Sequence, residues 1–163
     1  MFDRLLLALD DSPAGEVATL FVGAVARRTG ASVHVLHINE YLVGGNNLTL
    51  RTRQESLDLV TQAVRQLAEG GVRAGGSVSV SSYRGVPHQI VATALERSAD
   101  AIVLGSTRAR RLGRVFSGRV RERTTRLTAL PVLTAPSPLK VTSPAGVAGW
   151  TEGLDQALDS LLS

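Results

Sequence analysis

The residues best suited to chemistry in this sequence are arginines, and they gather in one segment. Between Arg108 and Arg126 there are eight arginines and a single acidic residue, Glu122. The segment therefore carries +7 in a chain whose net charge is +4, which leaves −3 for the remainder. A guanidinium group presents a planar fork of N–H donors that suits phosphate and carboxylate oxygens. The segment is a candidate site for an anion.

Three interpretations of this segment stay open: a loop that binds phosphate, a surface that binds nucleic acid, and a solvated face on a protein from a GC-rich gene. Nucleic-acid surfaces combine basic residues with aromatic side chains that stack on bases. This stretch offers only Phe116, and aromatic residues make up 4% of the chain. We therefore expect a small anionic ligand rather than nucleic acid, with Arg110, Arg111 and Arg114 flanking its crevice.

Other residue types give little indication of catalysis. The chain has no cysteine, which excludes disulfides and thiol chemistry. Its three histidines, His34, His37 and His88, lack sequence neighbours that would complete a metal site or a serine–histidine–aspartate arrangement. We interpret all three as structural and expect a binding protein rather than an enzyme.

Strand-like and helix-like patterns alternate along the chain. The two most apolar runs, Leu5 to Leu9 and Asp100 to Gly105, predict strands buried on both faces. Further strands are predicted at Ser32 to Ile38, Val78 to Ser81 and Pro131 to Ala135. This alternation predicts an α/β fold, an open doubly wound parallel five-stranded sheet. With the first and fourth strands as central neighbours, its strand order is 3-2-1-4-5.

The predicted helices lie between these strands. Ser12 and Pro13 suit the start of the first helix, and Gly30 suits its end. The second is expected from about Leu50, with Leu57, Val60, Val64 and Leu67 turned inward, after an irregular stretch from Asn39 to Thr49. The third opens at Gly85-Val86-Pro87, with Ile90, Val91, Ala94 and Leu95 inward. The fourth is expected from about Gly118 to Leu127.

The strand order also predicts where a ligand binds. The order reverses direction between the first and fourth strands, and open α/β sheets bind ligands in the crevice at such a point, at the carboxyl ends of the strands. Asp10 follows the first strand, and Gly105 ends the fourth. These two residues are expected to border the ligand.

Length and composition predict one domain with an appendage. Residues 1–136 form the expected domain, 137–149 a linker rich in Pro, Ser and Gly, and 150–163 a short helical tail. The sequence leaves open whether the tail packs on its own domain or on another subunit. The apolar run near the N-terminus has five residues, too few for a signal peptide or a membrane span. We expect a cytoplasmic protein without membrane contact.

Three stretches, RLLLALDDS, RGVPHQIVATALERSADAIVLGS and ALPVLTAP, are similar in order and spacing to the landmarks of universal stress proteins, over about residues 3 to 136. The resemblance implies an adenine-nucleotide alpha-hydrolase-like, Rossmann-like fold. It also implies a role in stress response and a homodimer that forms through the last strand, Pro131 to Ala135.

The ATP-binding members of that family carry the pattern G-x2-G-x9-G-[ST] after the fourth strand. Gly105 and Gly118 match its first and third glycines, while Arg108 replaces the second glycine and Arg119 replaces the Ser or Thr. The resemblance further implies that Asp10 contacts the ribose and that Ile38 lies on the adenine side.

Two hypotheses follow from the resemblance. The first is a stress-response regulator that binds ATP or a related adenine nucleotide, with Mg²⁺ accompanying it, and turns over little or none. The glycines shape its phosphate loop, and Arg108 and Arg119 contact phosphate. The alternative is a dimer without nucleotide, acting through protein partners, in which the two arginines close the pocket and the arginine segment is the docking surface.

Overall fold

The computed structural model describes residues 1–41, 48–106, 117–137 and 152–160, except the side chains of residues 117 and 118. The strands are β1 (Arg4–Ala8), β2 (Ser32–Tyr41), β3 (Ala74–Ser82), β4 (Ala101–Leu104) and β5 (Val132–Thr134). The helices are α1 (Pro13–Thr29), α2 (Arg53–Glu69), α3 (Val86–Glu96) and α4 (Ser117–Leu127).

The strands form one parallel sheet in the order β3-β2-β1-β4-β5, which confirms the predicted fold class. In the register, Ala8 at the end of β1 pairs with Leu36 of β2 on one side and with Leu104, the last residue of β4, on the other. β1 and β4 therefore end level with each other at one edge of the sheet, and β2 continues beyond them to Tyr41.

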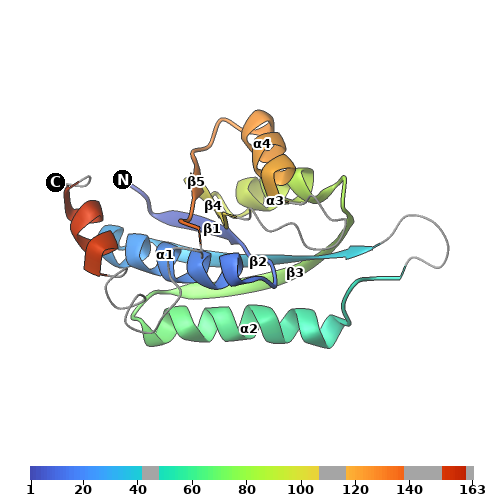
Figure 1. Ribbon diagram of the computed structural model, residues 1–163, viewed down its shortest axis with the longest axis horizontal. Coiled ribbons are helices and arrows are strands. Elements are labelled where there is room, and N and C mark those ends of the chain that lie inside the picture. Colours follow the sequence, from blue (N-terminus) through green and yellow to red (C-terminus); the bar gives the residue numbers. More distant parts are fainter. Residues whose placement is uncertain (42–47, 107–116, 138–151, 161–163) are drawn as a thin grey trace.

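Helices cover both faces of the sheet, as Figure 1 shows: α1 and α2 lie on one side, α3 and α4 on the other. Strand side chains alternate between these faces. Leu5 and Leu7 of β1 join the apolar cluster beneath α1 and α2, whereas Leu6 joins the one beneath α3 and α4. Two cores, rather than one, hold β1 in place.

The chain ends its first helix as its residue types predict. Ser12 caps α1, its Oγ accepting from the amide of Gly15 at 3.3 Å, with Pro13 in the first turn. Gly30 ends the helix with φ of +74°, a conformation that favours glycine.

Two parts of the sequence prediction were wrong. The stretch from Asn39 was expected to be irregular, but β2 continues to Tyr41 because β3 runs beside it to Ser82. Leu57 and Leu95 were expected to face inward, yet they are 36% and 65% exposed. Residues 42–47 lie outside the described part of the chain.

The C-terminal tail packs on its own domain. Residues 152–160 are helical, and Leu158 is buried in the cluster beneath α1, where Leu154 and Phe2 also pack. Arg28, near the end of α1, donates to Asp155 at 2.7 Å and to Asp159 at 2.8 Å. These contacts answer the question that the sequence left open. The predicted linker falls mostly on residues 138–151, which lie outside the described residues.

Within the described residues, no helix has both the length and the apolar character needed to span a membrane.

Candidate functional site

The candidate site lies where the central strands end. Asp10 comes two residues after β1, and Gly105 comes directly after β4, so the two flank the point at which the strand order reverses. Ile38 lies on the neighbouring strand β2, buried in the cluster beneath α3 and α4. The structure thus brings these three predicted residues to the same edge of the sheet.

The turn from β1 into α1 is tight and holds the Asp10 carboxylate at the surface. Oδ1 of Asp10 accepts a hydrogen bond from Ser12 Oγ at 2.6 Å. Gly15, in the first turn of α1, lies so close to Asp10 that a Cβ there would collide with the Asp10 carbonyl oxygen. Because Gly15 has no side chain, the exposed Asp10 can lie directly against the first turn of α1.

Gly105 makes a second close approach from the other strand. A Cβ at this position would lie 3.0 Å from the carbonyl oxygen of Ala14 and 3.4 Å from its side chain. The chain leaving β4 thus runs directly against the first turn of α1. Two strands and a helix start meet here with backbone packed directly on backbone, which holds the carboxyl edge of the sheet in one conformation.

Polar residues of β2 and the segment before α2 support this edge, and sequence reasoning missed their roles. The buried ring of His37 bonds through Nδ1 to the Leu9 carbonyl at 2.9 Å, which ties β2 to the end of β1. Asn39, also buried, donates to the Arg51 carbonyl at 2.8 Å, and the Arg51 side chain forms an ion pair with Asp11. The sequence signal for these roles was the presence of polar residues, His37 and Asn39, near the carboxyl end of the strand.

The second half of the predicted loop lies on α4. Gly118 and Arg119 fall in the first turn of this helix, and Arg119 is exposed. The hydrogen bond and charge of Arg84 lower the pKa of Tyr83, and the charges of Arg119 and Arg123 lower it further. The Arg119 charge therefore reaches Tyr83, which lies between β3 and α3. Arg108, together with Arg110, Arg111 and Arg114, lies outside the described residues.

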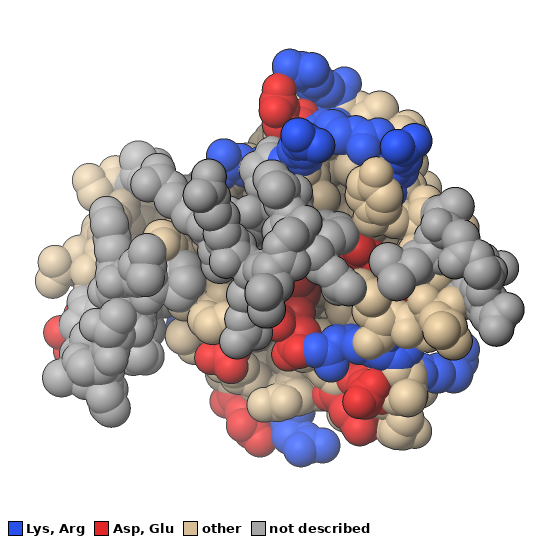
Figure 2. Space-filling view, turned by 45° about the vertical axis from the view of Figure 1, so that its right-hand side comes forward, with Lys and Arg blue, Asp and Glu red and all other residues tan. Residues whose placement is uncertain are grey.

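The charges on this side of the molecule are unevenly distributed. Figure 2 brings the carboxyl-end side forward and shows arginine side chains, with an acidic one among them, along the upper edge over α4, and Asp and Glu mixed among basic residues lower down. The basic residues of α4 include Arg119, Arg121 and Arg123, which are exposed, and Arg126, which pairs with Glu122 at 2.6 Å. Among the described residues, the exposed arginines of α4 thus make the surface on one side of the site positive, which favours an anion.

Metal ligands do not cluster in the described part of the chain, where no group of three His, Asp or Glu residues could hold an ion.

The family model for universal stress proteins matches residues 1–136. The chain belongs to the universal stress protein family. This confirms the predicted relationship, and the match ends where β5 has just been completed, so the docked helix 152–160 lies beyond it.

Solved universal stress proteins share this fold. One from Archaeoglobus fulgidus has 25% sequence identity and a TM-score of 0.67, with the alignment covering 83% of this chain and 100% of that chain. A structure from the same organism in complex with dAMP has 24% identity and a TM-score of 0.63, covering 82% and 98%. Another, in complex with cAMP, has 19% identity and a TM-score of 0.62, covering 84% and 98%. No curated protein matches the chain.

Within this universal stress protein, the six predicted site residues fall into three groups. Asp10, Ile38 and Gly105 meet at the carboxyl edge of the sheet, Gly118 and Arg119 begin α4, and Arg108 lies outside the described residues. Their contact with a ligand stays a prediction.

Proposed function

We propose that this universal stress protein binds ATP or another adenine nucleotide at the carboxyl ends of β1 and β4, with little or no turnover. The observation that carries the proposal is the exposed Asp10 at the point where the strand order reverses, held there by the close packing of Gly15 on Asp10 and of Gly105 on Ala14. Open α/β sheets bind ligands at such a point, and a carboxylate accepts hydrogen bonds from ribose hydroxyls. Structural relatives in complex with dAMP and with cAMP support an adenine nucleotide as the ligand class.

In this proposal each residue has a distinct task. Asp10 binds the ribose, Ile38 supports the adenine side, and Gly105 and Gly118 shape the phosphate loop. Arg108 and Arg119 supply charge where the family pattern has a glycine and a hydroxyl. Any Mg²⁺ arrives with the phosphates, whose oxygens are its preferred ligands.

The test is calorimetric titration of nucleotide-stripped protein with ATP, AMP and cyclic nucleotides. We expect the variant Asp10→Asn to bind about tenfold more weakly, because it loses a charge-assisted hydrogen bond while keeping the side chain's shape. Asp58→Asn is the matched control, since Asp58 is an exposed carboxylate on α2 whose bond is to Gln54.

Equal affinities of the two variants for ATP would remove Asp10 from the site. Absence of heat with every nucleotide would favour the alternative, a nucleotide-free dimer acting through protein partners, for which the exposed arginines of α4 offer a docking surface. Phosphate release from ATP in a single-turnover measurement would contradict the non-catalytic part of the proposal.

We also propose a homodimer formed along β5. This strand is the edge of the sheet, and an edge strand presents unpaired backbone groups that a second copy can bond. We expect the mass measured by sedimentation equilibrium to approach twice the chain mass of 17.2 kDa as the protein concentration rises. A mass that stays at 17.2 kDa across that range would contradict the dimer.

A further inference from the structure

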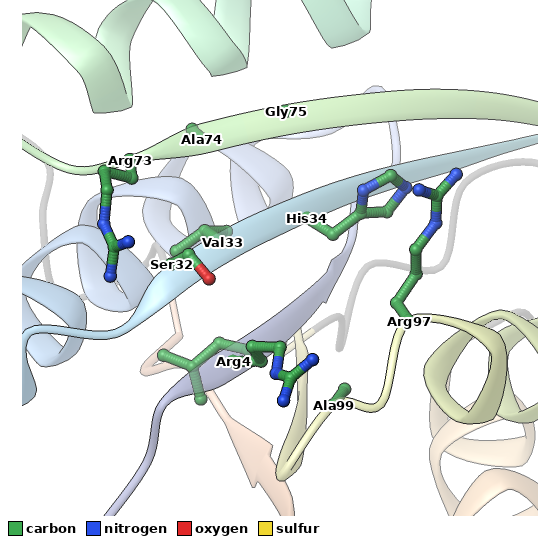
Figure 3. Close-up of a pocket in the computed structure, with 10 residues that line it drawn as sticks. Arg4, Ser32, Val33, His34, Arg73, Ala74, Gly75, Arg97 and Ala99 are labelled. Atoms are coloured by element: carbon green, nitrogen blue, oxygen red, sulfur yellow. The ribbon is translucent and has the colours of Figure 1, made fainter.

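A pocket of about 300 Å³ lies at the opposite end of the sheet from the candidate nucleotide site. It is formed where β1, β2 and β3 begin and where the chain leaves α3, as Figure 3 shows. Its volume is at the small end of the range in which proteins hold small molecules. The pocket therefore suits a compact ligand.

Three arginines from distant parts of the sequence line this pocket. Arg4 begins β1, Arg73 precedes β3, and Arg97 follows α3; Figure 3 shows them at different edges of the pocket, with the Arg97 guanidinium turned toward His34. None of the ten lining residues is acidic. Asp100 follows the lining residue Ala99, and its Oδ2 accepts the backbone N–H groups of Asp3 and Arg4 at 2.7 and 2.8 Å; these bonds, and secondarily the Arg4 charge, lower the pKa of Asp100.

Ordinary structural roles account for only part of this charge. Arg97 lies at the C-terminal end of α3, where a cation complements the helix dipole. Arg73 donates a hydrogen bond of 3.3 Å to the Gly30 carbonyl, which uses one of its five donors. Like charges gathered around one opening repel each other, and a bound anion would relieve that repulsion.

His34 adds a polar group between the arginines. Its Nε2 bonds to Ser77 Oγ at 2.8 Å, and Figure 3 shows its ring and the Arg97 guanidinium lying toward one another. Burial, and secondly the charge of Arg97, lower the pKa of His34. The Arg97 charge therefore reaches His34 inside the pocket.

A glycine keeps the pocket open beside His34. Gly75 of β3 is the register partner of His34, so a side chain there would project to the same face. A Cβ at Gly75 would meet no atom within 4 Å, whereas at Gly76 it would collide with Val60 of α2. The absence of a side chain at Gly75 is thus not required by packing, and it leaves room above the sheet.

We propose that this pocket binds a small phosphate-type anion carrying at least two negative charges. Arginines at three edges of the pocket supply N–H donors and three positive charges, and a single negative charge would leave most of the arginine charge uncompensated. The site is separate from the proposed nucleotide site and does not depend on it.

The experiment follows backbone amide signals by NMR during titration of the full chain with inorganic pyrophosphate, at 0.15 M salt to screen diffuse attraction. We expect saturable shifts at Val33, His34, Gly75 and Ala99, and none of comparable size at Asp10 or Gly105. Pyrophosphate lacks base and ribose but could also enter a phosphate loop at the carboxyl edge, so the position of the shifts, and not binding alone, assigns the site.

Two variants test the assignment in different ways. Gly75→Val fills the pocket without changing charge, in a strand that favours β-branched residues, and we expect at least a tenfold loss of pyrophosphate affinity. Arg97→Ala removes one fork and is expected to weaken binding about tenfold. Arg65→Ala, which removes an exposed arginine from α2 on the other face, is the control and should bind as the parent does.

The proposal is overturned if the shifts do not saturate, or if Gly75→Val and Arg65→Ala bind pyrophosphate equally well. It is equally overturned if the saturable shifts centre on Asp10 and Gly105, which would assign the anion to the carboxyl edge. Amide spectra of each unliganded variant establish that it is folded before the titration begins.

Discussion

Replacing Gly15 by alanine is expected to lower the free energy of unfolding by about 2 kcal/mol and to weaken nucleotide binding about tenfold. In an open helix the same change stabilises by about 1 kcal/mol, because alanine is the better helix former. Here the added Cβ collides with the Asp10 carbonyl oxygen and lies 2.9 Å from Asp10 Oδ1. The obstacle is backbone, so the turn between β1 and α1 has to shift, and Asp10 moves with it.

Urea unfolding and ATP titration of Gly15→Ala measure the two effects. Gly23→Ala is the matched control, since Gly23 lies in the same helix and its Cβ would meet only the ends of the Leu67 and Arg27 side chains, at 3.2 and 3.4 Å. We expect the control to match or exceed the parent in stability. If Gly15→Ala did the same and kept its ATP affinity, the tight turn would have no part in the site.

The largest loss of stability is expected for Leu6→Ala, about 3 to 4 kcal/mol. Leu6 is fully buried in the central strand, and its side chain joins the cluster beneath α3 and α4. Its neighbours belong to a sheet held on both faces, so they collapse poorly into the space that the substitution leaves.

Leu95→Ala provides the comparison for that loss. Leu95 lies on α3 over the same cluster but is 65% exposed, so its replacement should change the free energy of unfolding by no more than about 0.5 kcal/mol. Chemical unfolding of both variants by urea measures the difference. Similar losses from the two substitutions would mean that the exposure of Leu95 is wrong.

Most of the architecture could be read from the sequence because its signals are strong and local. β1 and β4 are apolar on both faces, as central parallel strands must be. In β3, which lies at an edge of the sheet, valine and serine alternate from Val78 to Ser81. Once β1 and β4 are neighbours, the chain order leaves few ways to place the other strands. Ser12, Pro13 and Gly30 fixed the ends of α1 by their conformational preferences.

The errors arose where packing overrides residue type. In α2 the completely buried Ser56 faces the sheet, while the adjacent Leu57 is 36% exposed. The helix lies over β2 and β3, and Gly76 of β3 provides the depression that Val60 fills. That depression fixes the rotation of the helix, and an apolar pattern read along α2 alone contains no information about it.

The residues at the carboxyl end of the sheet could be predicted from the sequence, whereas those around the pocket at the other end could not. Asp10 and Gly105 could be named in advance because a residue following a central strand must lie at the carboxyl edge. Arg4, Arg73 and Arg97 could not, because they are scattered through the sequence and only the parallel register brings them together. Arg4 begins β1, Arg73 directly precedes β3 and Arg97 ends α3, and that these places lie at one edge of the sheet becomes visible only after the strand order is known.

The helix at residues 152–160 has a consequence for the order of folding. Leu158 packs in the same cluster as Phe2 and Leu5, and Arg28 pairs with Asp155 and Asp159, which lie 127 and 131 residues further along the chain. Contacts between segments so far apart in sequence carry a high loop-closure entropy. We therefore expect the sheet and α1 to form first and this helix to dock on them late in folding.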